Sequence, residues 1–515
     1  MSGFCCSRYP TCSSAEALTS CTQSGGRWNA DNSQAAQAQL EEMNLTTISI
    51  AGLGKLGACM AGAAASRGFR VIGIDLSPAV LECANAGVAP VTEPGLSDLY
   101  RLHADQISAT ADYESAVRQS DITFVYVNTP SLPSGAFSSR NVIAAAKSIG
   151  RALAQKDDYH LVVLVSTVIP GTTQTIFKDA LERSSGKQCS RDFGLCFNPE
   201  FIALGTTIHN MLSPDFVVLG ESDERAGDLL DEFYGAFCLN GPPIVRVSLA
   251  EAELVKVGIN SYLTLKISFA NLIAEMCEAI PGARTDRVTR TIGLDSRIGG
   301  KFLTGGLPYG GPCFPRDNGA LAFLARSLDV DDAILNATDD FNRQIIDRTL
   351  ARIRPLLAPG SAVGILGLAY KPGTDVITES PALDLAMALS REGYPIVAHD
   401  PLAMKNAARV LPQGTVFALS PRAVIEKTDV VVIANPCDEF RSLVREDFED
   451  KTSPVTVLDC WRLLEQELAD SEQVRYIALG TADGFDVQSM ARKLTSIANE
   501  TLQGGTTDAH LDRVA

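Results

Sequence analysis

The fold of this 515-residue chain is decided by one stretch, Ile48-Ser49-Ile50-Ala51-Gly52-Leu53-Gly54-Lys55-Leu56-Gly57. A short apolar run predicts a buried strand, and three glycines spaced Gly-x-Gly-x-x-Gly follow it at once. The small residues of 58–66 predict a helix packed closely on that strand, and the next apolar run, 71–74, ends at Asp75. Strand, glycine turn, helix, strand and acid together predict the first unit of a Rossmann-like domain.

Each glycine of this turn has a separate task if the turn binds a dinucleotide. Gly52 allows the tight turn, Gly54 lets a pyrophosphate approach the backbone, and Gly57 permits close contact between helix and strand. Asp75 lies where a carboxylate accepts a hydrogen bond from a ribose 2′-hydroxyl, and its charge repels a 2′-phosphate. The pattern favours NAD over NADP as the cofactor. A tight turn without a ligand is the alternative that the motif alone leaves open.

Short apolar runs alternate with longer helical patterns along the rest of the chain, as is typical of α/β proteins. The runs are continuous rather than alternating, which indicates strands buried on both faces. We predict strands at 48–51, 71–74, 123–127, 161–166, 194–197 and 216–219 in a first group, and at 362–366, 396–398, 430–434, 455–458 and 476–479 in a second. A weak repeat links the groups, because the second also shows a strand, Gly364-x-x-Gly367, a helix, and a strand that ends at Asp400.

These patterns predict an α/β fold of two Rossmann-like, doubly wound parallel-sheet domains joined by a long central helix. The helix is expected at 249–280, where Gly258 is the only breaker. We expect a disordered extension at 1–42, a dinucleotide-binding domain at 43–248, a central helical domain at 249–340, a second Rossmann-like domain at 341–500 and a flexible tail at 501–515.

The charge of the chain excludes several classes of partner. It has 44 basic and 61 acidic side chains, hence a formal net charge of −17. We expect no nucleic acid and no membrane as partners, because both call for a basic surface. No apolar run reaches the roughly 18 residues of a membrane span, and the N-terminus lacks the pattern of a secretory signal. The thirteen cysteines lack metal-type spacing, so we expect a cytoplasmic, thiol-rich protein without a metal.

Three loops that follow predicted strands carry candidate site residues: Asn128-Thr129-Pro130, Ser166-Thr167-Val168-Ile169-Pro170-Gly171 and Asn198-Pro199-Glu200-Phe201. Ligands of open α/β sheets bind beyond the carboxyl ends of the strands, so these loops are expected to line the cofactor cleft. Simple strand termination by proline and glycine is the plainer interpretation of the first two. Glu200 is either a general base in the cleft or an acid on a solvated loop.

Glu253, Lys256 and Asn260 are spaced i, i+3 and i+7 on the expected central helix and therefore lie on one face. A lysine and an asparagine that project together into a cleft can donate hydrogen bonds to a developing oxyanion. The alternative is an ordinary polar stripe.

The stretch 305–317, GGLPYGGPCFPRD, surrounds one cysteine with glycines and prolines. Cys313 stands just before a predicted helix, whose N-terminus favours a thiolate, and Asp317 follows four residues later. The alternative is a buried cysteine that acts as a small hydrophobic residue, the commoner role of a free thiol.

Taken in order, these motifs resemble the UDP-glucose/GDP-mannose dehydrogenase family, over about residues 45 to 480. To those already quoted the resemblance adds Arg297-Ile298-Gly299, Leu366-Gly-Leu-Ala-Tyr-Lys371-Pro-Gly-Thr-Asp and Glu379-Ser-Pro-Ala-Leu. The family implies an NAD-dependent, four-electron oxidation of a nucleotide sugar from alcohol to acid. It also implies that the second Rossmann-like domain binds the UDP-sugar, that the central domain mediates dimerisation, and that the protein is a homodimer or larger homo-oligomer.

The resemblance implies catalytic roles for six residues. Cys313 matches the nucleophile, and Asp317 matches a base that also orders water. Lys256 and Asn260 match residues that stabilise the oxyanion. Glu200 matches the acid implicated in thioester hydrolysis. The sixth, Thr129, matches a residue that holds water.

Binding residues follow from the same resemblance. Arg297 matches an arginine that contacts the substrate across a subunit interface. The implied cofactor-binding residues are Gly52, Gly54, Leu56, Gly57, Asp75, Thr129 and Thr167. The implied substrate-binding residues are Glu200, Phe201, Lys256, Asn260, Arg297, Tyr309, Gly310 and Lys371.

The chain departs from the family pattern in positions that bear on the recognition of the nucleotide and the sugar. Leu204 replaces a second glutamate, and Pro308 and Pro312 replace Gly and Ser. Val376 and Thr378 replace an acid and an arginine. The run Asp459-Cys460-Trp461-Arg462 replaces Asp-Gly-Arg-Asn. The run at 297–303 and Cys-Phe-Pro favour the UDP-glucose branch, with UDP-glucuronate as product. GDP-mannose, a UDP-N-acetylhexosamine, a two-electron hydroxy-acid dehydrogenase and an inactive nucleotide-sugar sensor remain alternatives.

Overall fold

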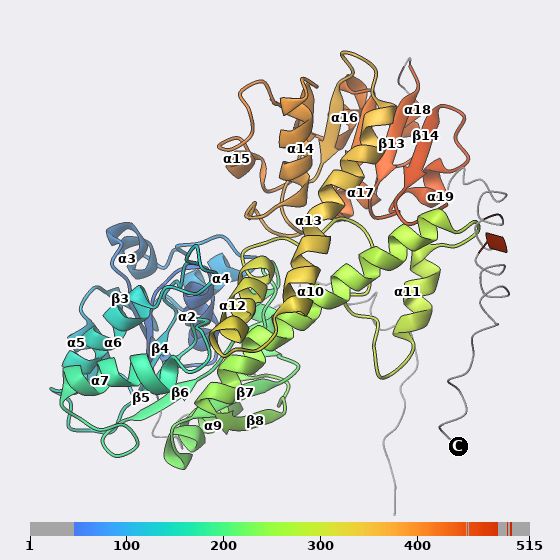
Figure 1. Cartoon of the computed structure of the whole chain (residues 1–515). Helices are drawn as coiled ribbons and strands as arrows, with labels where there is room; N and C mark the ends of the chain where they lie inside the picture. The colour runs from blue at the N-terminus through green and yellow to red at the C-terminus, as the bar shows by residue number, and fades with distance from the viewer. Residues whose placement is uncertain (1–45, 450, 452, 483–491, 493–494, 497–515) are drawn as a thin grey trace, which may run out of the picture.

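Two α/β domains lie at opposite ends of one long helix (Figure 1). The computed structural model describes residues 46–449, 451, 453–482, 492 and 495–496. The extension expected at 1–42 and the tail expected at 501–515 lie outside the described residues.

The first sheet has eight strands in the order β3-β2-β1-β4-β5-β6-β7-β8. They are β1 (Thr47–Ala51), β2 (Arg70–Ile74), β3 (Ile107–Thr110), β4 (Ile122–Val125), β5 (Leu161–Leu164), β6 (Gly194–Phe197), β7 (Val217–Glu221) and β8 (Ile244–Ser248). In the parallel register, Ile50 lies between Gly73 of β2 and Phe124 of β4. Strand order reverses between β1 and β4, and ligands of such sheets bind at this switch point.

Helices cover both faces of this sheet. They are α2 (Lys55–Ser66), α3 (Pro78–Asn85), α4 (Leu96–Leu102), α5 (Tyr113–Arg118), α6 (Arg140–Leu153), α7 (Lys178–Ser185), α8 (Thr207–Leu212) and α9 (Glu224–Phe237). Phe124 joins the apolar cluster under α2, α4, α8 and α9, whereas Val125 joins the cluster under α5, α6 and α7. Neighbouring residues of β4 are thus buried on opposite faces, and its one polar side chain, Thr123, is hydrogen-bonded to Ser49 and His160.

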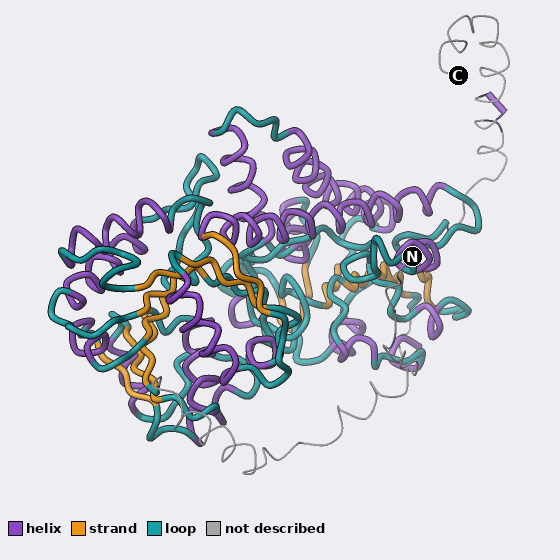
Figure 2. Tube along the Cα trace, turned by 90° about the horizontal axis from the view of Figure 1, so that it is seen from below, coloured by secondary structure: helices purple, strands orange, loops and turns teal. Residues whose placement is uncertain are grey.

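Helix α10 (Leu249–Ala279) connects the domains with 31 residues, about 46 Å at 1.5 Å per residue. A capping box fixes its start: Ser248 Oγ accepts from the backbone N–H of Glu251, whose side chain accepts from the backbone of Ser248. The other helices of the centre are α11 (Thr285–Gly293), α12 (Phe314–Ser327) and α13 (Ala333–Ile353). α12 lies alongside α10, and α13 continues into the second domain (Figure 1). Seen from below, the strands form two separate groups with helices around them (Figure 2).

The second sheet has six parallel strands in the order β11-β10-β9-β12-β13-β14. They are β9 (Val363–Leu366), β10 (Ile396–His399), β11 (Val416–Phe417), β12 (Val430–Ile433), β13 (Val455–Asp459) and β14 (Val474–Ala478). Its helices are α14 (Pro381–Arg391), α15 (Met404–Ala407), α16 (Pro421–Lys427), α17 (Asp438–Arg441), α18 (Glu446–Glu449) and α19 (Glu465–Leu468). No helix in the described part of the chain is long and apolar enough to span a bilayer.

The internal repeat is visible in the backbone. Gly52 (φ +99°) donates to the carbonyl of Ile74 at 2.7 Å, and Gly367 (φ +97°) donates to the carbonyl of His399 at 2.8 Å. The acids differ: Asp400 is buried, and its two oxygens accept from four backbone N–H groups, those of 368, 369, 402 and 403. The second domain therefore uses its acid to hold its own loop.

The predicted fold is confirmed, with two corrections. Strands β3, β8 and β11 were not expected, because β3 and β8 mix polar with apolar residues and β11 has two residues. In addition, β7 runs antiparallel to β6, so the first sheet is not wholly parallel. Apolar runs predict that a strand is buried, but they carry no information about its direction.

Candidate active site

The glycine turn after β1 forms a cradle at the switch point. A β-carbon on Gly52 would lie 2.7 Å from the carbonyl oxygen of Tyr126, and one on Gly57 would lie 1.9 Å from the carbonyl oxygen of Gly52. Among the described residues, apart from its neighbours in the chain, no atom lies within 4 Å of such a position at Gly54, which caps α2. Open space beside the first N–H groups of a helix suits a pyrophosphate. The side chain of Leu56 packs on the core, so this residue offers its backbone to a ligand.

Asp75 lies beside this turn at the end of β2. One of its oxygens accepts from the backbone N–H of Leu53 and the other from that of Ser77, both at 2.9 Å. Unlike Asp400, Asp75 is only half-buried, so its carboxylate retains capacity for a ribose hydroxyl. The residues predicted to bind the cofactor therefore fit a dinucleotide.

Thr129 and Thr167 join the loops that follow β4 and β5. The buried hydroxyl of Thr129 donates to the carbonyl of Thr167 at 2.7 Å, and Ser166 donates to the carbonyl of Val127 at 2.6 Å. These bonds hold the two loops together at the carboxyl ends of their strands.

Glu253 has a structural position. Its fully buried carboxylate accepts from the N–H of Gly171 at 2.5 Å, and from the N–H and hydroxyl of Thr173 at 2.8 and 2.5 Å. Glu253 therefore fastens the loop after β5 to α10, which is a structural role.

Lys256 and Asn260, one and two turns further along α10, reach the other motifs. Lys256 Nζ donates to the carbonyl of Glu200 at 2.6 Å, and Asn260 Nδ2 donates to Asp317 at 2.6 Å. The hydroxyl of Tyr126 donates to Glu200 at 2.8 Å. Desolvation raises the pKa of Glu200, opposed by the hydrogen bond from Tyr126 and the charge of Lys256. Helix α10 thus links the Asn-Pro-Glu-Phe loop to the cysteine loop.

Cys313 caps the N-terminus of α12, and its carbonyl accepts from the N–H of Asp317 at 2.8 Å. Asp317 is fully buried and pairs with the Arg316 guanidinium at 3.0 Å. The cysteine is exposed, yet enough protein surrounds the thiol that desolvation raises its pKa. Asp317 raises that pKa further, whereas Lys256, Arg316 and Lys371 lower it. Desolvation therefore opposes the thiolate that the helix N-terminus and the nearby cations favour.

The cysteine loop packs tightly on the second domain. A β-carbon on Gly310 would lie 1.8 Å from the carbonyl oxygen of Glu379. Gly311 has φ +85°, donates to the carbonyl of Thr378 at 3.1 Å, and lies against the ring of Tyr370. Thr378 acts here through its backbone. This packing places the loop that contains Lys371 close to Cys313.

Three predicted substrate residues have other contacts in this chain. The hydroxyl of Tyr309 donates to Asp339 on α13, and its ring is buried. Arg297 is exposed and pairs with Asp295, away from the cluster around Cys313. The ring of Phe201 has the ammonium of Lys256 5.3 Å from its centre.

Two of the departures from the family pattern serve the junction between domains. Arg462 is buried, pairs with Asp286 of α11 at 2.8 Å, and donates to the carbonyl of Gly305 at 2.7 Å. The indole of Trp461 donates to the carbonyl of Ala434 at 3.1 Å and lies against Gly306. Both residues therefore fix the start of the cysteine loop.

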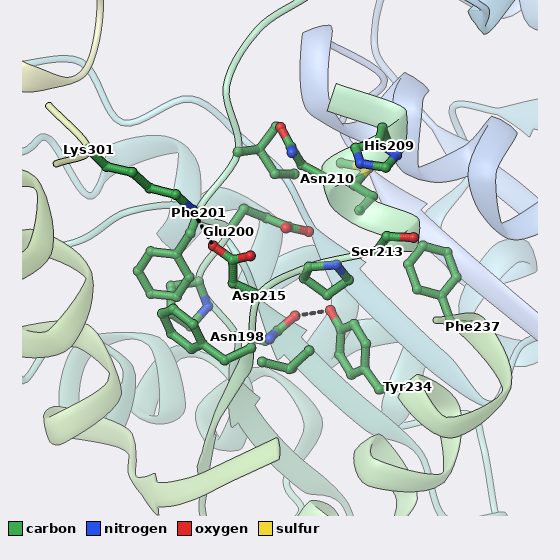
Figure 3. Close-up of a pocket in the computed structure, with 16 residues that line it drawn as sticks. Asn198, Glu200, Phe201, His209, Asn210, Ser213, Asp215, Tyr234, Phe237 and Lys301 are labelled. Atoms are coloured by element: carbon green, nitrogen blue, oxygen red, sulfur yellow. Dashed lines mark hydrogen bonds and ion pairs between the residues drawn. The ribbon is translucent and has the colours of Figure 1, made fainter. Parts of the chain in front are cut away.

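A cavity of about 240 Å³ lies behind the Asn-Pro-Glu-Phe loop, between α8 and α9 (Figure 3). Glu200 and Phe201 line it, and the ion pair of Lys301 with Asp215 stands at one side. Cys313 is not among its lining residues, so this cavity is distinct from the cluster around the thiol.

Tyr126 and Arg316 were not predicted, although each contacts a predicted catalytic residue. Tyr126 extends the apolar run of β4 by one residue and resembles a core aromatic in the sequence. Arg316 stands between Cys313 and Asp317, so its place in the quoted loop is the signal that could have found it. The exposed thiol of Cys313 thus lies near the buried carboxylate of Asp317, the ammonium of Lys256 and the amide of Asn260. The glycine turn that suits a dinucleotide lies beside this cluster. Such parts suit oxidation of an alcohol through a covalent sulfur adduct.

Comparison with known proteins agrees with an enzyme that oxidises an alcohol. Three profiles of the UDP-glucose/GDP-mannose dehydrogenase family match the chain: the NAD binding domain at 46–238, the central domain at 250–344 and the UDP binding domain at 364–466. The chain therefore belongs to the UDP-glucose/GDP-mannose dehydrogenase family. The glycine turn and Asp75 lie in the matched NAD binding domain, so the cofactor is NAD, as predicted.

Relatives of different substrate classes are similar over most of the chain. UDP-glucose 6-dehydrogenase AglM of Haloferax volcanii is 37% identical over 81% of this chain and 97% of its own. GDP-mannose 6-dehydrogenase of Pseudomonas aeruginosa is 35% identical over 78% and 93%. The solved structure of a UDP-glucose dehydrogenase from Pyrobaculum islandicum superposes with a TM-score of 0.76 at 33% identity, covering 84% of this chain and 97% of that one.

Proposed function

We propose that the protein oxidises the C6 alcohol of UDP-glucose to the carboxylate of UDP-glucuronate, with a thioester on Cys313 as the last covalent intermediate. The observation that carries the proposal is the exposed thiol of Cys313 one helical turn from buried Asp317, which accepts from Asn260. A two-electron hydroxy-acid dehydrogenase needs no cysteine. Relatives named UDP-glucose 6-dehydrogenase, at 31–37% identity, support the choice of sugar.

The first oxidation removes a proton and a hydride from the C6 alcohol and leaves an aldehyde. NAD supplies the hydride acceptor for this oxidation and for the next. Lys256 and Asn260 donate to the sugar oxygen as negative charge develops on it. The Thr129 hydroxyl donates to Thr167, so its lone pairs are free to accept from a water that relays the proton.

The second oxidation needs the thiol. Cys313 Sγ bonds to the aldehyde carbon and gives a thiohemiacetal, whose oxygen Lys256 and Asn260 again stabilise. Loss of the second hydride gives a thioester, and water then releases the acid and restores the thiol. Asp317 accepts the proton of the attacking thiol, and Glu200, with its raised pKa, exchanges a proton with the hydrolytic water.

The UDP-sugar is bound between the domains in this proposal. Lys371 supplies positive charge for the diphosphate, and Gly310 gives backbone contacts. Phe201 provides an apolar wall. Tyr309, whose hydroxyl is engaged by Asp339 and whose backbone is engaged by Asn342, contributes its ring edge. Arg297 is exposed and lies apart from the cluster, which is consistent with a contact to the substrate of a second copy.

A homodimer about α10 completes the proposal. Leu254, Tyr262, Phe269 and Met276 are each 45–59% exposed and, seven or eight residues apart, follow one side of the helix. A second copy of the chain is the partner that suits such a stripe, because a two-fold contact pairs it with itself. We place the enzyme in the cytoplasm, where a catalytic thiol stays reduced.

Purified protein with NAD and a panel of UDP-glucose, GDP-mannose and UDP-N-acetylmannosamine tests the proposed substrate. We expect UDP-glucuronate from UDP-glucose at the highest kcat/KM. Turnover of either other sugar nucleotide with none of UDP-glucose would overturn the choice of sugar and leave the chemistry in place. No NADH from any of them would indicate the inactive sensor.

A further inference from the structure

A charged contact joins the glycine turn of the first domain to the loop of the second domain that contains Lys371. Lys55, the first residue of α2, lies inside the Gly-x-Gly-x-x-Gly motif, and its ammonium pairs with Asp375 at 3.0 Å. Asn406 of α15 donates to the carbonyl of Asp375 at 2.9 Å. The loop is therefore anchored on both sides, four residues beyond Lys371.

A second contact of opposite polarity supports the middle of this loop, at Gly373. Glu93 is only 7% exposed, and one of its oxygens accepts from the N–H groups of Gly205 and Thr207 at 2.8 and 3.0 Å. A β-carbon on Gly205 would lie 2.6 Å from the carbonyl oxygen of Gly373. Glu93 thus holds the segment that follows the Asn-Pro-Glu-Phe motif directly against the loop with Lys371.

The two contacts have complementary charges. The first domain supplies a cation, Lys55, to an anion of the second, and an anion, Glu93, near a cation of the second, Lys371. Desolvation lowers the pKa of Lys371, and the charge of Glu93 opposes this lowering and so favours the charged ammonium. Neither Lys55 nor Glu93 belongs to the cluster around Cys313.

We propose that Lys55 and Glu93 are positioning residues that dock the loop 371–375 on the first domain and so set Lys371 for the nucleotide sugar. The inference rests on the proposed function, in which Lys371 binds the diphosphate. A ligand that contacts both domains binds only molecules in which the loop is docked. Its apparent affinity is therefore proportional to the docked fraction, and any loss of docking weakens it. Once UDP-glucose is bound to such a variant, Cys313 and the residues of α10 have the same positions as in the wild type. Loss of either residue is therefore expected to raise KM for UDP-glucose while kcat changes little.

A double-mutant cycle tests the contact of Lys55 with Asp375. We expect Lys55→Met and Asp375→Asn each to raise KM for UDP-glucose about two- to fivefold, with kcat within about twofold of wild type. The double variant is expected to be no worse than the more affected single one, because each change breaks the same pair. If the effects of the two single substitutions on KM multiply in the double variant, or if kcat falls while KM is unchanged, the proposal is overturned.

Two variants of Glu93 separate charge from support of the loop. Glu93→Gln keeps a carbonyl oxygen for Gly205 and Thr207 but removes the charge, whereas Glu93→Ala removes both. We expect KM for UDP-glucose to rise in the order wild type, Gln, Ala, and an unchanged KM in both variants would contradict the role of Glu93. If the Ala variant does not fold, as judged by circular dichroism, the Gln variant alone decides the question.

The exposed Arg183–Asp179 pair of α7 provides the control, since Arg183→Met is expected to leave KM and kcat unchanged. Wild-type turnover separates this proposal from the proposed function. A wild type that does not oxidise UDP-glucose refutes the proposed function, whereas an active wild type with unaffected Lys55 and Glu93 variants refutes the positioning role only.

Discussion

At the residue scale, the ionisation of Cys313 decides when the second oxidation can proceed. The thiol's pKa is raised above its ordinary value, and the thiolate is the nucleophile, so we expect acid formation to rise with pH through that pKa. Lys256 lowers the pKa of Cys313, so Lys256→Met is expected to shift this rise to higher pH. The same variant removes a donor to the oxyanion and should slow turnover by about 10²- to 10³-fold.

The pH–rate profile of the second oxidation, started from the aldehyde, measures this effect. A profile that stays flat from pH 6 to 10, or one that moves to lower pH in Lys256→Met, would contradict the proposed role of the thiolate.

Asp75 is expected to set the choice of cofactor. Asp75→Asn keeps an acceptor for the turn and removes the charge that repels a 2′-phosphate. We predict that the ratio of kcat/KM for NAD to that for NADP falls roughly 10- to 100-fold, since a hydrogen bond to a charged group is worth about 1.5–3 kcal/mol. Equal use of NAD and NADP by the wild type would show that the carboxylate has no such role.

The candidate site could be predicted from the sequence wherever a residue type and its spacing define a chemical task. Cys313, Asp317, Lys256 and Asn260 meet in the structure as that logic requires. Ionisation could not be predicted, because the pKa of Cys313 depends on how much protein surrounds the thiol. That surrounding includes residues distant in the sequence, Lys256 of α10 and Lys371 of the second domain among them.

At the scale of single elements, α10 supports the site by holding the loops that approach it. Glu253 accepts three hydrogen bonds from the loop after β5, so Glu253→Ala leaves buried donors without a partner. We predict a loss of about 1–3 kcal/mol in the free energy of unfolding and a weaker affinity for NAD. Thermal unfolding with and without NAD measures both. The matched variant Glu253→Gln retains an acceptor and should lose less, and equal stability of all three proteins would contradict the structural role.

Elements were predictable where burial is uniform. The strands β1, β4, β5 and β12 are fully or almost fully buried. The last two are wholly apolar, and the first two interrupt their apolar residues only with small hydroxyl residues. The edge strand β8 has no fully buried residue, and its direction follows from pairing with β7 rather than from its own residues. Pairing between distant segments is a tertiary property, which explains why the antiparallel step between β6 and β7 was not foreseen.

At the scale of the whole molecule, the apolar stripe of α10 bears on assembly. We predict that Phe269→Glu shifts a dimer toward monomer, because a charge at the centre of a two-fold apolar contact is buried without a partner. Multi-angle light scattering after size exclusion measures the mass of each form. Leu419→Glu, at an exposed leucine on the second domain, is the control and should leave the mass unchanged. A monomeric wild type would contradict the proposed dimer.

The four-electron oxidation through Cys313 is tested most directly by counting NADH and acid for each UDP-glucose consumed, with wild type and Cys313→Ala side by side. We predict two NADH and one UDP-glucuronate for each UDP-glucose with the wild type. With Cys313→Ala we predict no acid and only slow, reversible formation of the aldehyde. Release of UDP-glucuronate by Cys313→Ala at a rate near that of the wild type, with two NADH for each sugar, would contradict the covalent mechanism.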